Sequence, residues 1–241
     1  MTRNTFALGL ACAASALAAA PAHAEFIQFY QGNAAAVPFD TASARCPIGA
    51  ATCTSDIVGA SLSYATSAGT LTATGSTRTS SPFGSTTQPA DVIQDSVPRF
   101  GGLGVLTRPI DLLGGDSIGS GSLLGLVSGR ETLTLTFANP VTLTSIVFWD
   151  QDHGEQNTFR GGRFDLLVDG TSRITDAALS TVFATSQYGR SFAFRPASLD
   201  AGFDQSFYVG GVQVQVPLPG TLALLGSALA AAGLARRARR A

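Results

Sequence analysis

The chain of 241 residues contains no lysine, and all 15 of its basic residues are arginines. Chemistry that needs a lysine Schiff base or a lysine general base is therefore excluded. Charged residues make up only 13% of the chain, which has two histidines and one tryptophan. Between the two ends of the chain, no stretch shows the apolar period of an amphipathic helix. We therefore expect a body without amphipathic helices and without lysine-based catalysis.

The first 24 residues have the three parts of a secretory signal peptide. Arg3 supplies the positive start, and residues 6–20 form the apolar core of a helix. Ala22 and Ala24 occupy the small-residue positions of a cleavage site directly before Glu25. The alternative is a lipoprotein signal at Cys12, but the lipobox pattern is not met there. We expect cleavage after Ala24.

The last 26 residues, 216–241, contain a proline-rich segment, an uncharged apolar run over 221–235 and a terminal arginine cluster. Fifteen helical residues would span about 22 Å, less than the roughly 30 Å hydrocarbon core of a bilayer. This predicts a short transmembrane helix, with the arginines in the cytoplasm and the body outside. The residues that define the segment are Val216, Pro217, Leu218, Pro219, Gly220, Arg236, Arg237, Arg239 and Arg240.

The order of these three parts resembles the PEP-CTERM sorting signal of Gram-negative bacteria. The resemblance implies processing by an exosortase, a membrane-embedded cysteine protease, after transient anchoring in the inner membrane. It also implies a link to exopolysaccharide or biofilm production. Leu218 replaces the glutamate that is usual in the family, so the chain has a Pro-Leu-Pro variant of the signal. The alternative is an ordinary tail-anchor helix.

Removal of both ends leaves an acidic body. Arg3 and the four terminal arginines are lost, so ten basic residues face all 16 carboxylates and the net charge becomes −6. An acidic domain has no electrostatic footprint for nucleic acid and is repelled by anionic membrane surfaces. We therefore expect no nucleic-acid partner, and we expect the mature protein in the periplasm, on the cell surface or outside the cell.

Two cysteines remain in the body, Cys46 and Cys53, on either side of Pro47 and Gly49. An even pair in an exported chain predicts one local disulfide. The alternative is that the two cysteines bind a metal or act as a redox pair. Such sites typically have a closer Cys-x-x-Cys spacing or histidine partners, whereas six residues separate Cys46 from Cys53.

The body, residues 25–215, predicts an all-β domain, because Thr and Ser are abundant and Gly and Pro interrupt the chain at short intervals. The clearest strand covers residues 131–137, where leucine and phenylalanine alternate with threonine. About eight to ten short strands predict a β-sandwich of jelly-roll type, flanked by the signal-peptide helix and the C-terminal helix. The predicted strands are 60–66, 70–76, 131–137, 141–149, 163–169, 190–195 and 207–216.

Several connections can also be predicted. Residues 67–69 and the pair Asp169-Gly170 are expected to form hairpin turns, and Asn139-Pro140 is expected to turn the chain back after its clearest strand. Gly210-Gly211 predicts a β-bulge. The Ser/Thr/Pro/Gly-rich residues 76–90 are expected to form a long exposed loop.

Asp150, Asp152 and Glu155 form a run of carboxylates directly after a predicted strand. Three carboxylates at alternating positions around a glycine turn can converge on one hard cation such as Ca²⁺. The run therefore predicts a candidate calcium site, with a solvated polar turn as the alternative and no other cofactor expected.

Trp149 precedes this run, and an exposed tryptophan beside carboxylates would suit stacking on a sugar ring. The alternative is a core tryptophan at the end of a buried strand. Residues 115–119, with Ser117, match a Gly-x-Ser-x-Gly string, and His153 follows later. A nucleophile elbow needs a strand before the serine and a helix after it, and here a glycine-rich segment leads into a strand.

The sequence therefore favours an exported, non-enzymatic envelope or matrix protein with a structural or adhesive role. A carbohydrate-binding, lectin-like module is the second hypothesis, and a secreted serine hydrolase is the third.

Overall fold

The computed structural model describes residues 23–32, 37–38, 43–50, 52–53, 55–95, 101–107, 117–123, 127–150, 162–197 and 206–217. The chain divides into two compact units, and residues 24–215 form the larger one. In the described part of the chain, no helix is long and apolar enough to cross a membrane. The predicted helices of the signal peptide and of residues 221–235 fall outside the described residues.

Twelve β-strands make up the secondary structure of the described ranges, which contain no helix. The all-β prediction is therefore confirmed. The strands are β1 (His23–Gln28), β2 (Ile57–Gly59), β3 (Ser61–Thr66), β4 (Gly69–Ser81), β5 (Gly84–Asp95), β6 (Gly102–Leu106), β7 (Ser120–Leu123), β8 (Val127–Asp150), β9 (Arg163–Val168), β10 (Thr171–Ala178), β11 (Val182–Pro196) and β12 (Phe207–Val216).

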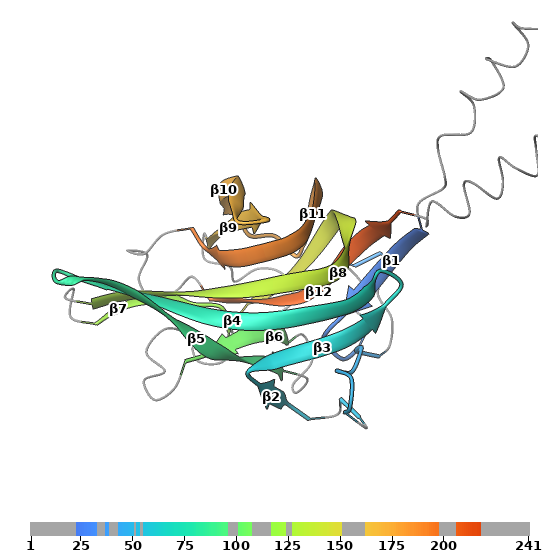
Figure 1. Ribbon diagram of the computed structural model, residues 1–241, viewed down its shortest axis with the longest axis horizontal. Helices are drawn as coiled ribbons and strands as arrows, with labels where there is room; N and C mark the ends of the chain where they lie inside the picture. The colour runs from blue at the N-terminus through green and yellow to red at the C-terminus, as the bar shows by residue number, and fades with distance from the viewer. Residues whose placement is uncertain are drawn as a thin grey trace, which may run out of the picture. The chain divides into compact units, whose positions relative to one another are not determined.

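The strands form one hydrogen-bonded sheet in the order β1-β12-β6-β5-β4-β8-β11-β9-β10, with β2 beside β5, β3 beside β4 and β7 beside β8 (Figure 1). In addition, β12 pairs with β8. The hydrogen-bonded sheet therefore closes on itself through five strands, β12, β6, β5, β4 and β8. A jelly roll consists of two separate sheets, so this single network does not show the predicted jelly-roll arrangement.

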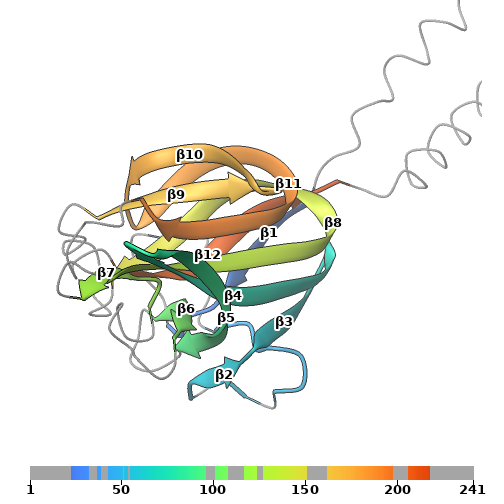
Figure 2. The ribbon, with the colours of Figure 1, turned by 60° about the vertical axis from the view of Figure 1, so that its left-hand side comes forward.

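The longest strand, β8, has 24 residues and pairs with β4, β7, β11 and β12. The first half of β8 pairs with β4 and the second half pairs with β12. On its other edge, β8 pairs with β11 along both halves. The predicted turn at Asn139-Pro140 is wrong, because the chain continues through these residues as one bent strand (Figure 2). Between the pairs Ser191↔Thr136 and Gly189↔Val141 the register shifts. The extra residues of β8 form a bulge, which accommodates a proline that has no N–H to donate.

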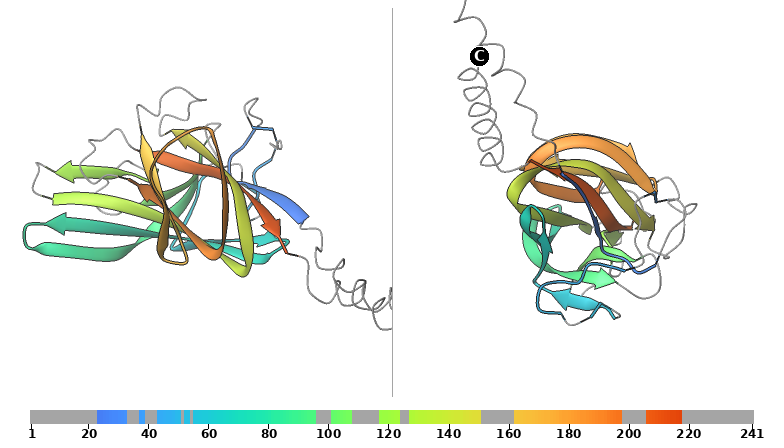
Figure 3. Two further views of the ribbon diagram at one scale, coloured as in Figure 1. Left: turned by 90° about the horizontal axis from the view of Figure 1, so that it is seen from above. Right: turned by 90° about the vertical axis from the view of Figure 1, so that its right-hand side faces the viewer.

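Hairpins whose turns lie within the described residues connect β3 with β4, β4 with β5 and β9 with β10. The predicted hairpin between 60–66 and 70–76 is confirmed as β3 and β4. The turn between β9 and β10 is confirmed too, with φ of +50° at Asp169 and +77° at Gly170, as a type I′ turn requires. The predicted loop at residues 76–90 is wrong, because these residues form the hairpin of β4 and β5. Figure 3 shows this hairpin extending from the sheet beside β7 and the first part of β8.

The largest fully buried side chains of the core are aromatic, with the exception of Ile27. Phe148 packs against Phe164 and Phe207, with ring centroids 4.7 Å and 5.3 Å apart. A second cluster contains Tyr30, Val37, Val147, Trp149 and Tyr208. Rings buried to this degree dominate the hydrophobic stabilisation of a domain.

Candidate functional site

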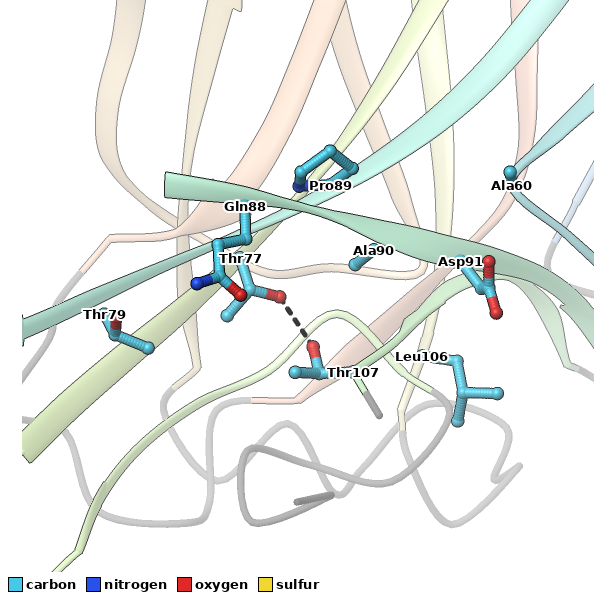
Figure 4. Close-up of a pocket in the computed structure, with 9 residues that line it drawn as sticks. All are labelled: Ala60, Thr77, Thr79, Gln88, Pro89, Ala90, Asp91, Leu106 and Thr107. Atoms are coloured by element: carbon cyan, nitrogen blue, oxygen red, sulfur yellow. Dashed lines mark hydrogen bonds between the residues drawn. The ribbon is translucent and has the colours of Figure 1, made fainter. Parts of the chain in front are cut away.

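A pocket of about 220 Å³ lies on β4, β5 and β6 (Figure 4). Its polar lining combines the hydroxyls of three threonines with one side-chain amide and one carboxylate, and its apolar lining comes from proline, alanine and leucine. The lining residues are Ala60, Thr77, Thr79, Gln88, Pro89, Ala90, Asp91, Leu106 and Thr107.

The register of the sheet brings the backbone positions of these residues side by side. Thr77 pairs with Gln88 across β4 and β5, and paired residues present their side chains on the same face. On the other side of β5, Asp91 pairs with Leu106 of β6. Thr107 directly follows β6, and its side chain lies beside that of Thr77 (Figure 4).

A chain of hydrogen bonds leads from the pocket to a buried carboxylate. The hydroxyl of Thr107 donates to Oε1 of Glu131 at 2.6 Å, and the backbone N–H of Gly119 donates to Oε2 at 2.8 Å. The hydroxyls of Thr77 and Thr107 lie 2.6 Å apart. Because Thr107 gives its single proton to Glu131, Thr77 must be the donor to Thr107. The oxygen of Thr77 is then left as an acceptor toward the pocket.

Glu131 was assigned from the sequence only as the start of a strand, and its role as a buried partner was missed. Its side chain is 0% exposed, like that of Leu133. The alternation that placed the leucines in the core also places Glu131 on the inward face. An acidic residue at an inward-facing position of a strand is the signal that points to such a network, because a buried carboxylate needs hydrogen-bond partners.

This arrangement can bind hydroxyl-rich molecules. Threonine, glutamine and aspartate side chains supply both donors and acceptors, while Pro89 and Leu106 supply apolar surface. Such a combination fits a sugar, whose hydroxyl groups alternate with C–H groups. In the described part of the chain, no three His, Cys, Asp or Glu side chains group as a metal site would require.

Trp149 is 0% exposed, so it is a core residue and not the exposed ring that stacking on a sugar would need. Its ring packs edge-on against Tyr30, with centroids 5.0 Å apart. Asp150, the last residue of β8, is also buried, at 4% exposure. Asp152 and Glu155 lie outside the described residues, so the candidate calcium site stays a prediction.

Ser117 is 0% exposed. Its neighbour Ile118 forms an isolated bridge with Phe207, and the chain then enters β7 rather than a helix. The strand–turn–helix context of a nucleophile elbow is therefore not formed at Ser117. His153 lies outside the described residues.

The predicted disulfide is confirmed, because Cys46 and Cys53 are joined, with their Cα atoms 5.4 Å apart. The loop that the disulfide closes is attached to the sheet, since the N–H of Ile48 donates to the backbone oxygen of Ser63 in β3 at 2.6 Å. This hydrogen bond ties the disulfide-closed loop, which precedes β2, to the sheet.

The chain thus combines an all-β domain with a separate segment at its C-terminus. Residues 215–240 match the family model of the PEP-CTERM protein-sorting motif. The chain is therefore a PEP-CTERM-containing protein, and the motif supports sorting through an exosortase system and export to the envelope. No curated protein and no solved structure matches the chain.

Proposed function

We propose that this chain is an exported, non-enzymatic protein with a structural or adhesive role in the cell envelope or extracellular matrix, where it contacts exopolysaccharide. An exosortase-like protease sorts it while the C-terminal segment anchors it transiently in the inner membrane. The sorting motif at residues 215–240 is the observation that carries the proposal.

The described domain supports a binding role over a catalytic one. Ser117, the one nucleophile that the sequence singled out, is buried and lacks the local structure that would activate it. The pocket on β4, β5 and β6 offers hydroxyls, an amide and a carboxylate, which suit sugar hydroxyls.

Mass spectrometry of the mature protein from its native host tests the sorting step. We expect a chain that begins at Glu25 and ends near residues 217–220. Replacement of Arg236, Arg237, Arg239 and Arg240 by alanine should block processing, because the arginine stop is then missing. The matched control replaces Arg173, which is exposed on β10. A mature wild-type chain that retains Arg240 would contradict the processing step.

Retention of exopolysaccharide from the host matrix tests the adhesive role. The immobilised mature protein should retain this polysaccharide, and Thr77→Val should weaken retention because it removes the acceptor in the pocket. Thr175→Val makes the same change at an exposed position of β10 and should have no effect. If the wild-type protein retains no matrix polysaccharide, the adhesive role is wrong.

A further inference from the structure

Serine and threonine side chains cover one face of the sheet across β3, β4, β8 and β11. The strand register places them in rows that run from strand to strand. One row contains Ser63, Thr72, Thr136 and Ser191, and the next contains Ser61, Thr74 and Thr134. We call this surface the hydroxyl face.

The side chains on the opposite face of the same strands fix the orientation of these rows. Leu71 and Ala73 of β4 and Leu133 and Leu135 of β8 are all buried, at 0–1% exposure. Because side chains alternate along a strand, the residues between them point away from the core. The hydroxyl face is therefore the outer surface of this part of the sheet.

Three arginines lie at one end of the hydroxyl face. Arg78 of β4 pairs directly with Arg130 of β8, although like charges at opposite positions destabilise a sheet. Arg195 of β11 lies close to Arg130, since both guanidinium groups face Asp165. Arg195 Nη2 lies 3.1 Å from Asp165 Oδ2, and Arg130 Nη1 lies 3.9 Å from it.

Asp165 thus faces two guanidinium groups, those of Arg130 and Arg195. Burial lowers the pKa of Arg130, and the charges of Arg195 and Arg78 lower it further, while Asp165 acts in the opposite direction. Arg78 is exposed, and its Nη2 donates to the hydroxyl of Ser85 at 3.3 Å. No carboxylate of the described residues forms an ion pair with Arg78. This end of the face therefore carries an excess of positive charge on a domain that is otherwise acidic.

The dimensions of the face fit an extended polymer. Neighbouring strands lie about 4.8 Å apart, and side chains on the same face of one strand repeat about every 6.8 Å. From Thr136 to Arg130 along β8 the face is therefore about 20 Å long, so several sugar units in succession can contact it. Hydroxyls both donate and accept hydrogen bonds, as sugar hydroxyls do, and a guanidinium group binds a carboxylate with two parallel hydrogen bonds.

We propose that the hydroxyl face binds an extended polysaccharide that carries carboxylates. The threonine rows contact the hydroxyls of the polysaccharide. Arg78 binds one of its carboxylates, and the less exposed Arg130 adds positive charge at the same end of the hydroxyl face. This proposal rests on the proposed contact with exopolysaccharide and adds to the pocket a second contact surface, for which it names the ligand class.

Titration calorimetry of the mature protein with an oligogalacturonate tests the proposal. The fully methyl-esterified oligomer of the same length is the matched probe, since it keeps the sugar units and lacks the charges. We expect the acidic oligomer to bind at least tenfold more tightly than the ester, by about 1.4 kcal/mol or more. Its affinity should fall as salt is added.

Two pairs of variants locate the site. Arg78→Gln should weaken binding of the acidic oligomer about tenfold, as expected for the loss of a charge-assisted hydrogen bond. Arg173→Gln, which removes the same charge from exposed β10, should change it less than about twofold. Thr134→Val should weaken binding of both oligomers, whereas Thr175→Val should not. Thermal unfolding of each variant checks that the fold is kept.

Equal binding of the two oligomers, or equal effects of Arg78→Gln and Arg173→Gln, would overturn the assignment of this surface. Analytical sedimentation gives a further contradicting outcome. If the wild-type protein is a dimer and Arg78→Gln is a monomer, the arginines bind a second copy of the chain and the assignment is also overturned. If the protein still retains matrix polysaccharide in any of these cases, the proposed function stands and only the surface is wrong. If it binds neither oligomer and retains no matrix polysaccharide, both proposals fail.

Discussion

Gly210 lies so close to the indole ring of Trp149 that no side chain fits between them. A Cβ atom on Gly210 would lie 2.2 Å from Nε1 and 2.5 Å from Cδ1 of Trp149. Gly210 is also the residue at which β12 shifts register against β8, between Val209 and Gly211. The predicted bulge at Gly210-Gly211 is therefore confirmed, and the structure adds its packing role against the ring of the single tryptophan.

Gly210→Ala is expected to lower the free energy of unfolding by about 1–3 kcal/mol, because an added methyl group overpacks a well-filled core. Denaturant unfolding of the mature protein measures the loss. The same substitution in a Trp149→Phe background should cost less, because the phenyl ring lacks Nε1, the indole atom that the methyl group meets most closely. Equal costs in both backgrounds would show that the indole ring does not cause the loss.

Tyr64 takes part in a buried hydrogen-bond network. Its hydroxyl donates to Oε1 of Gln94 at 3.1 Å, and Nε2 of Gln94 donates to the backbone oxygens of Phe29 and Arg45 at 2.9 Å and 3.1 Å. Tyr64→Phe would leave Oε1 of Gln94 buried without its donor, so we expect a loss of about 1–3 kcal/mol. Tyr188→Phe is the control, since Tyr188 is 64% exposed and should change stability by less than about 0.5 kcal/mol.

The same tyrosine has a consequence for alkaline stability. Burial raises the pKa of the Tyr64 hydroxyl far above its ordinary value, so the folded state keeps the neutral phenol. The contribution of the neutral Tyr64 phenol to the free energy of unfolding is complete below the unfolded pKa of about 10. It is lost as the pH rises above that value, because the unfolded chain then ionises and the folded protein does not. A titration followed by phenolate absorbance should show that Tyr64 ionises only on unfolding. Reversible ionisation of all tyrosines in the native protein would contradict this.

The disulfide between Cys46 and Cys53 is expected to contribute about 2–3 kcal/mol, because it restricts a short loop in the unfolded chain. Denaturant unfolding with and without reductant measures this contribution. The double variant Cys46→Ser with Cys53→Ser should match the reduced wild-type protein and should not respond to reductant. A wild-type midpoint that does not move on reduction would show that the cross-link contributes nothing.

Local signals in the sequence predicted the elements that depend on neighbouring residues. The turn at Asp169-Gly170 needs two left-handed residues, and the strand at 131–137 alternates apolar and polar side chains. The hairpin of β4 and β5 was missed because its arms are polar on both faces. Its threonines pair with each other, as in the contact between the hydroxyls of Thr79 and Thr86 at 2.9 Å, and no apolar period marks them.

Long-range pairings could not be predicted in the same way. The second half of β8 pairs with β12, as in Trp149↔Tyr208, and no local pattern specifies a partner so far along the chain. The pocket depends on such pairings too, since Thr77, Thr107 and Glu131 come from three separate segments. Asn139-Pro140 misled for a related reason. A proline usually ends a strand, but here a bulge allows β8 to continue.

Glu25, the first residue after the predicted cleavage site, joins β1 to two other segments. Its Oε2 accepts a hydrogen bond from the N–H of Ser67 at 2.8 Å and another from the Ser67 hydroxyl, and its Oε1 lies 2.5 Å from Nη1 of Arg45. Burial raises the pKa of the Glu25 carboxyl, but the hydrogen bonds from Ser67 and the hydrogen bond and charge of Arg45 together lower it below its ordinary value.

A lowered pKa in the folded state means that this carboxylate stabilises the fold above its unfolded pKa of about 4.3. The contribution is lost as the pH falls through the lower, folded pKa. We therefore expect Glu25→Gln to be less stable than the wild-type protein near neutral pH, and the difference to shrink toward about pH 3. Ser67→Ala removes one donor and should show a smaller effect of the same sign. Denaturant unfolding over this pH range measures both, and a difference that does not depend on pH would show that the charge of Glu25 is not responsible.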